Sequence, residues 1–173
     1  GKGKNASVEG DRNVYFSDYS GAFNGKIRDF TLVQFSGTAS VTMGKGLDKS
    51  LFGATYEFII TDDTLENTDA MLILKKNHSA FKNVVITIDS ITSNLLQSSG
   101  GQVTLITSKF FKDADDFDKN TIIVMDENGD QISDASYTII YTWDKKQGGS
   151  VAIAYLGVDI VIDGTEEDKV VLT

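Results

Sequence analysis

The sequence contains no cysteine and no proline among its 173 residues. Without cysteine the chain cannot form disulfides, thiolate-bound zinc sites or iron–sulfur clusters, and it has no thiol nucleophile. Without proline it has no proline-rich linker and no segment of the kind that proline-binding domains recognise. Any fold it adopts is therefore held without disulfide cross-links.

Histidine is almost absent as well. His78 is the only histidine, so a metal site with several histidine ligands is excluded, and a serine–histidine–aspartate triad would have to use this residue. His78 directly follows Lys75, Lys76 and Asn77, a setting typical of a solvated loop. We therefore expect no catalytic histidine.

Arginine, the preferred bidentate reader of phosphates and bases, occurs only as Arg12 and Arg28. The net charge is −9, and a chain this acidic repels polyanions. No apolar run approaches the roughly 18 to 20 residues that cross a bilayer. We expect neither a nucleic-acid partner nor a transmembrane segment.

Valine, isoleucine and threonine are abundant, with 45 of the 173 residues between them. These residues suit the pleated, half-buried surface of a sheet. Apolar and polar residues alternate with a period of two in several segments, which predicts strands with one apolar face. The expected strands lie at 30–35, 38–43, 55–60, 84–89, 102–107, 121–125, 137–143, 150–155 and 158–162.

The second half of the chain contains two predicted turns. The polar, glycine-ended stretch from Asp144 to Gly149 joins two alternating segments and predicts a hairpin of 137–143 with 150–155. Asn128 and Gly129 both tolerate positive φ, which predicts a tight turn that closes 121–125 onto a short following strand.

Strands separated by turn signals at intervals of about 8 to 15 residues predict an all-β fold, an antiparallel β-sandwich of immunoglobulin-like or jelly-roll-like type. One short helix is expected near residues 62–76, where acidic residues come early and lysines late. The alternative there is an acidic loop followed by a strand from Met71 to Lys75.

The expected domain organisation is a flexible N-terminal arm at residues 1–10 followed by a single β-sandwich domain at 11–173. The polar run from Ser98 to Gly101 allows an alternative with two modules, 11–97 and 102–173. The arm is basic on an otherwise acidic protein, so it could add a strand to the sheet of a neighbouring subunit.

The stretch from Val124 to Gly157 resembles the immunoglobulin-like modules of bacterial cell-surface, adhesin and S-layer proteins. It has an Asp-x-Asn-Gly turn at Asp126, Asn128 and Gly129, and a Tyr-Thr-aliphatic-x-Tyr strand from Tyr137 to Tyr141. A polar loop and an alternating strand that runs to Gly157 follow it. The resemblance implies a β-sandwich used as a spacer, adhesive or lattice-forming unit, and it brings no catalytic residues.

Acidic residues cluster in the third quarter of the chain. Calcium prefers hard oxygen ligands, and several aspartates in one loop can supply them. An EF-hand is excluded, because the twelfth position counted from Asp126 is Tyr137 instead of glutamate. The other interpretation is a solvated acidic stretch that opposes aggregation. The candidate calcium ligands are Asp113, Asp115, Asp116, Asp118, Asp126, Asn128 and Asp130; we expect no other cofactor.

Aromatic residues offer the remaining candidates for a ligand site. Trp143, Tyr141 and Tyr155 share parity with the apolar residues of their strands, so we expect them in the core. The alternative is a sugar-stacking platform, which would require some of Tyr15, Phe16, Tyr19 and Trp143 to be exposed. Gly44-Lys45-Gly46 fails the phosphate-loop pattern, because no serine or threonine follows the lysine.

These features predict a non-enzymatic structural or surface protein, a subunit or module of a cell-surface layer, filament or adhesin. It is expected outside the cell or on its surface and to associate with itself or with neighbouring modules. One alternative is a virion component such as a tail-tube or capsid subunit, in which a β-rich, cysteine-free chain is also expected. The other is a module that binds carbohydrate or another ligand.

Overall fold

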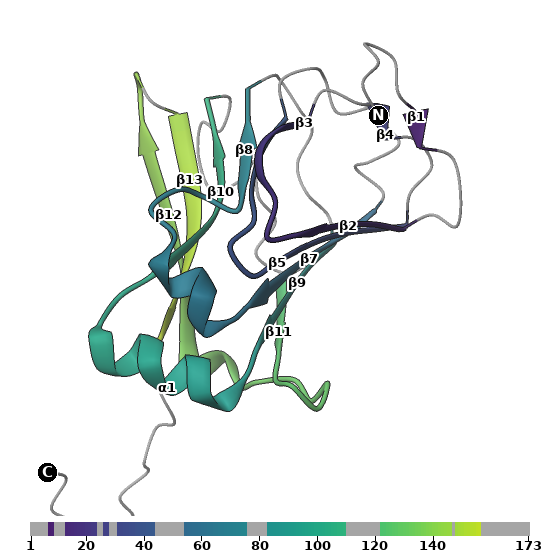
Figure 1. Ribbon diagram of the computed structural model, residues 1–173. Helices are drawn as coiled ribbons and strands as arrows, with labels where there is room; N and C mark the ends of the chain where they lie inside the picture. The colour runs from purple at the N-terminus through teal and green to yellow at the C-terminus, as the bar shows by residue number, and fades with distance from the viewer. Residues whose placement is uncertain are drawn as a thin grey trace, which may run out of the picture.

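The structure is a computed structural model that describes residues 7–8, 13–23, 26–27, 31–43, 54–75, 83–109, 122–146 and 148–156. Over these ranges, no helix is both long enough and apolar enough to cross a membrane. Two stacked β-sheets make up most of the fold, and they meet along one side of the molecule and diverge toward the other (Figure 1).

The first sheet has five strands, and every neighbouring pair in it is parallel. The order across the sheet follows the order along the chain, so each strand lies beside the one formed one coil earlier. Its strands are β2 (Asn13–Ser17), β5 (Leu32–Ser36), β7 (Thr55–Ile60), β9 (Asn83–Ile88) and β11 (Ile122–Met125).

The second sheet has six strands. The four that come first along the chain are parallel neighbours. The last two form an antiparallel hairpin, which pairs antiparallel with the fourth strand. A separate parallel pair joins β1 (Ser7–Val8) and β4 (Lys26–Ile27). The strands of the second sheet are β3 (Ser20–Phe23), β6 (Ser40–Met43), β8 (Leu72–Leu74), β10 (Val103–Ser108), β12 (Tyr137–Asp144) and β13 (Gly148–Tyr155).

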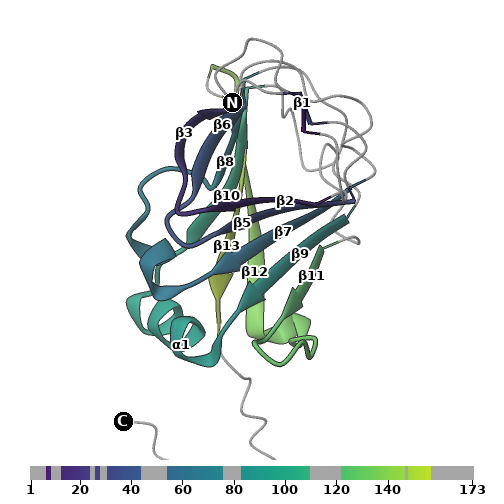
Figure 2. The same cartoon turned by 45° about the vertical axis from the view of Figure 1, so that its right-hand side comes forward.

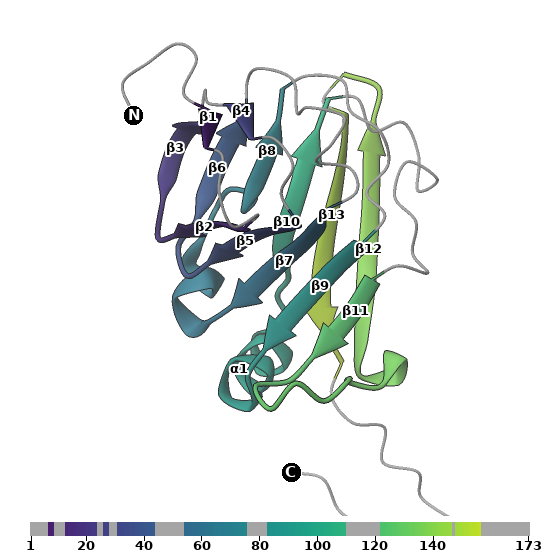
Figure 3. The same cartoon turned by 90° about the vertical axis from the view of Figure 1, so that its right-hand side faces the viewer.

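The chain alternates between the two sheets, passing from β2 to β3, from β5 to β6, from β7 to β8 and from β9 to β10. Each passage completes one side of a coil, and successive coils stack in register (Figures 2 and 3). This arrangement is a two-sheet parallel β-solenoid. Stability in such a fold comes mainly from contacts between neighbouring coils.

The antiparallel β-sandwich, whether immunoglobulin-like or jelly-roll-like, is therefore wrong. The strands are present, but they are stacked parallel instead of folded back on one another. Alternation with a period of two places residues on faces and carries no information on the direction of the neighbouring strand. The hairpin of β12 and β13 is confirmed, with Tyr137 opposite Tyr155 and Asp144 opposite Gly148.

The helix expected near residues 62–76 is present only as one short 3₁₀ helix, and the alternative for its second part, a strand from Met71 to Lys75, is confirmed by β8. That segment holds a short 3₁₀ helix, η2 (Asp62–Glu66), followed by strand β8. The α-helix, α1 (Ser90–Ser99), lies at the passage from β9 to β10 and includes part of the run read as a module boundary. Strands from both sides of that run share the same sheets, since β10 lies between β8 and β13.

The core is built from ladders of equivalent residues in successive coils. Phe16, Phe35 and Phe58 occupy one register position in β2, β5 and β7. Their rings stack, with centroids 5.4 Å apart for the first pair and 5.2 Å for the second. Ile86 and Val124 continue the same row in β9 and β11. All five side chains are buried.

Candidate functional site

The N-terminal end of the solenoid is formed by β2 and β3, which are the outermost strands of the two sheets (Figure 2). Among the described residues, β2 pairs only with β5 and β3 only with β6. The described residues thus leave the outer backbone edge of each strand without a partner, and such edge N–H and C=O groups are strong templates for pairing.

This end carries very little charge. From Asn13 to Phe23 the sequence has one ionisable acid or base other than tyrosine, Asp18. Its Oδ1 atom accepts hydrogen bonds from the backbone N–H of Thr38 at 3.0 Å and from the Thr38 hydroxyl at 3.3 Å. The Asp18 backbone N–H donates to the Ser36 carbonyl. The Asp18 carboxylate is thus hydrogen-bonded to the neighbouring coil.

The corner between β2 and β3 requires an unusual backbone. Asp18 has φ of 52° and Gly37, in the next coil, has φ of 61°. A Cβ atom at Gly37 would lie 2.1 Å from Asp18 Oδ1. Glycine at position 37 therefore permits both the left-handed turn and the approach of the Asp18 carboxylate.

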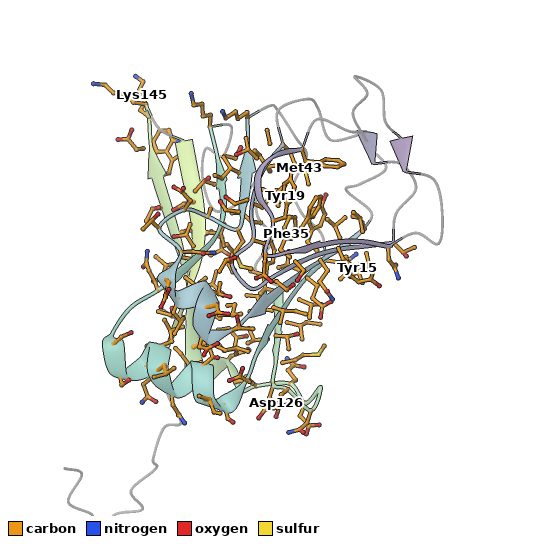
Figure 4. The ribbon with its side chains drawn as sticks, in the orientation of Figure 1. Tyr15, Tyr19, Phe35, Met43, Asp126 and Lys145 are labelled. Carbon is orange, nitrogen blue, oxygen red and sulfur yellow. The ribbon has the colours of Figure 1, made fainter. Side chains whose placement is uncertain are left out.

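Aromatic side chains close the inside of this end. Tyr19 and Phe23 both pack on Phe16, with ring centroids 5.8 Å and 5.3 Å from it, and the Tyr19 hydroxyl donates to the Ala22 carbonyl. Tyr15 points to the other face of β2 and is 58% exposed (Figure 4). Tyr19 is 40% exposed.

The C-terminal end of the first sheet is different, because the chain folds back over its outer edge. Asp126 Oδ1 accepts the backbone N–H groups of Asn128 at 2.8 Å and Asp130 at 3.0 Å. Gly129 has φ of 83°, and the turn places Gln131 in an antiparallel bridge with Met125. The predicted turn at Asn128 and Gly129 is confirmed.

This folded-back segment is bonded to β11 and to the helix. Ile132 N–H donates to the Val124 carbonyl, so part of the outer edge of β11 is already occupied. Glu127 reaches α1, where its carboxylate accepts the Ser90 backbone N–H at 3.1 Å and the Ser90 hydroxyl at 2.9 Å. A carboxylate at a helix N-terminus is favoured by the helix dipole. Asp89 caps the same helix by accepting the Thr92 N–H.

Two tyrosines have perturbed acidity. Burial raises the pKa of the Tyr56 phenol above its ordinary value. Burial also raises the pKa of Tyr137 to about 12, and the hydrogen bond that its hydroxyl donates to Asp134 at 2.8 Å adds to the effect. Both phenols remain neutral at physiological pH, and both side chains are buried in the core.

The expected calcium ligands divide into two groups. Asp113, Asp115, Asp116 and Asp118 lie outside the described residues, as do His78 and Gly44-Lys45-Gly46. Asp126, Asn128 and Asp130 lie together in the turn beyond β11, where Asp126 Oδ1 is engaged by two backbone N–H groups. In the part of the chain that the structure describes, no three histidine or acidic side chains are grouped as a metal site would require. Calcium binding stays a prediction.

The expected core position of Trp143 is wrong, because its side chain is 54% exposed. Trp143 shares a face with Tyr137, which is buried, so the parity was correct. Its strand pair reaches the side where the two sheets diverge (Figure 1), and there the inner face is not covered by the opposite sheet. Tyr141 and Tyr155 pack partly buried against the core, as expected, and Phe16 is buried.

The comparisons with known proteins give no further evidence. No family model, curated protein or solved structure matches this chain. The solenoid and the contrast between its two ends are therefore the features that bear on function. Sequence reasoning missed the open edge of β2, because no sequence signal distinguishes an end coil from an inner one.

Proposed function

We propose that this chain is a non-enzymatic structural module of an extracellular or cell-surface assembly, such as a layer, filament or adhesin. The observation that carries the proposal is the unequal treatment of the two ends of the solenoid. At one end the chain's own turn at Asp126 to Ile132 folds over the edge of the first sheet. At the other end, the described residues leave the outer edges of β2 and β3, two strands without charged residues, unpaired. End coils that stand alone in solution normally carry a polar cap.

The body between the ends supports the same role. Five parallel strands of the first sheet run in register, and their inner rows are filled by large apolar side chains, of which the three phenylalanines stack. Packing of this kind resists deformation, because the ring of Phe35 is held by the coil before it and the coil after it. A stiff body suits a spacer or a load-bearing unit.

The test is to locate the protein on intact cells of the organism that makes it. Antibodies raised against the folded chain are applied with gold labelling before and after the cells are permeabilised. We expect label on unpermeabilised cells, along a continuous surface structure that electron microscopy resolves. Label that appears only after permeabilisation would overturn the proposal.

Carbohydrate binding is a second candidate function, favoured by the exposed rings of Tyr15 and Trp143. Tyr15 shares a row of the outer face with Gln34 and Glu57, whose side chains are bonded to each other at 2.7 Å. Planar rings beside amide and carboxylate groups are suited to sugars. Screening the folded chain on a glycan array tests this candidate, and a Tyr15→Ala variant should abolish any binding that uses this row.

A further inference from the structure

We propose that two copies of this chain pair through the outer edge of β2, antiparallel about a two-fold axis at Tyr15, so that the first sheet continues from one copy into the other. This inference deepens the proposed assembly role and rests on it, since it names the first partner as a second copy. It concerns the edge of β2 alone, where the described residues provide no second neighbour.

The edge of β2 lacks the features that normally keep strand edges apart. Natural proteins blunt exposed edges with lysine, proline, bulges or inward-pointing charges. Strand β2 reads Asn-Val-Tyr-Phe-Ser, which contains none of these residues. Its register with β5 runs through all five positions without a bulge. A regular, uncharged edge of this kind is a template for a further strand.

Electrostatics selects this end as the place where identical copies meet. Each copy carries a net charge of −9, so two copies repel each other unless the surfaces in contact hold little charge. In the described stretch from Asn13 to Phe23, which forms the N-terminal end, the one acid, Asp18, is bonded to Thr38. The opposite end of the first sheet carries Asp126, Glu127, Asp130 and Asp134. Figure 4 shows Tyr15 and Asp126 at opposite edges of that sheet.

The covered edge of β11 also favours two-fold pairing over a head-to-tail stack. A head-to-tail stack would have to pair β2 of one copy with β11 of the next, but the outer edge of β11 is partly occupied by Gln131 and Ile132. Within the first sheet, the remaining partner for β2 is therefore β2 of another copy. Such a contact is isologous and closes at two subunits.

Two-fold pairing of a five-residue strand over its full length places Tyr15 opposite Tyr15 of the partner copy, and Asn13 opposite Ser17. Directly opposite residues in an antiparallel pair have Cα atoms about 4.5 to 5.5 Å apart. The two tyrosine rings, each 58% exposed in a single copy, would then pack against each other across the strands. Only one sheet continues in this way, because the two sheets lie in different planes (Figure 1) and one two-fold axis cannot be normal to both.

The first experiment measures the mass of the full chain by sedimentation equilibrium over a range of concentrations. We expect a dimer of twice 18.8 kDa at high concentration. Tyr15→Lys should weaken dimerisation at least tenfold, because two lysines would face each other at the axis. The matched control is Ile123→Lys, since Ile123 lies in the same register row at the other edge of the sheet and is also exposed. This control should dimerise like the wild type.

A second experiment does not depend on how the lysine affects folding. The chain has no cysteine, so Tyr15→Cys introduces a single thiol. Opposite residues at the axis have the Cα separation that a disulfide needs. Mild oxidation removes two electrons and two protons from the pair of thiols and transfers them to an added oxidant such as oxidised glutathione. We expect most of this variant to become a covalent dimer, and Ile123→Cys to stay predominantly monomeric.

The pairing would be overturned by a chain that is monomeric at every concentration. Equal cross-linking of the two cysteine variants would also overturn it. So would a dimer that Ile123→Lys disrupts and Tyr15→Lys does not. A monomer that binds a different protein through β2 would also overturn it. These outcomes are separable from the surface-labelling test. A labelled but monomeric protein would refute the dimer alone, and a dimer found only inside cells would refute the proposed function alone.

Discussion

Phe35 stacks on Phe58 with the ring centroids 5.2 Å apart and the ring planes 13° from parallel, although the two residues belong to successive coils. Phe16 stacks on the other side of Phe35. The middle ring is therefore held on both faces, and it is fully buried. This contact joins the first three coils and makes the stack the most direct test of how the solenoid is stabilised.

Replacing Phe35 should reveal that stabilisation. Phe35→Ala removes a buried ring and two stacking contacts, and we expect a loss of about 3 to 5 kcal/mol in the free energy of unfolding. Phe35→Leu keeps most of the apolar volume and loses the stacking, so its cost should be smaller. Urea denaturation followed by far-UV circular dichroism measures both. Equal losses for the two variants would show that the stack itself contributes nothing.

Two glycines separate backbone strain from steric clash. Gly148 and Gly129 have φ of 86° and 83°, but a Cβ atom at Gly148 would lie 2.2 Å from the Ser108 carbonyl oxygen, whereas Gly129 has open space. Gly129→Ala should cost only the left-handed conformation, about 1 to 2 kcal/mol. Gly148→Ala must also move the end of β10, so its thermal midpoint should fall further. Equal midpoints would contradict the close approach of β10 to the hairpin.

The contact between Glu127 and α1 should contribute through the helix dipole. Glu127→Gln weakens the interaction with Ser90, and we expect a loss of about 0.5 to 1 kcal/mol in unfolding free energy. Asp130→Asn removes the same charge from the same turn and should leave stability within about 0.5 kcal/mol. Thermal unfolding at low salt compares them, and high salt should reduce the difference. A larger effect for Asp130→Asn would argue against the dipole contact.

Tyr137 should make the free energy of unfolding depend on pH in the alkaline range. Its pKa is raised to about 12 from the ordinary value of 10.0, so the folded state favours the neutral phenol. This contribution is fully present below pH 10 and is lost as the pH rises through about 12. The stability difference between the wild type and Tyr137→Phe should therefore shrink over that window. Urea unfolding at several pH values measures it, and a constant difference would contradict the raised pKa.

Trp143 is the only tryptophan, so the fluorescence of the protein reports on one site. Because its side chain is 54% exposed, we expect emission shifted to the red and quenched readily by acrylamide. A Tyr141→Phe variant should leave this quenching unchanged. Blue-shifted emission that resists quenching would place the ring in the core.

Much of the local structure could be predicted from the sequence. Alternating residues from 55 to 60 and from 84 to 88 gave strands with the correct inward faces, and the turn at Asn128 and Gly129 follows from two residues that tolerate positive φ. The α-helix was missed, although Asp89 before it and Gly100 after it are the usual start and stop signals. Its apolar residues are few, and the serine-rich end was read as a linker.

The sequence by itself determined where strands form and which side chains point inward, because both depend on neighbours along the chain. Only the tertiary structure decided that β2, β5, β7, β9 and β11 are parallel, that β2 is the edge strand of its sheet among the described residues, and that Trp143 is exposed. The physical reason is that strand direction, sheet order and burial depend on partners from other coils. Pleating, with its period of two, is the same whichever partner is present.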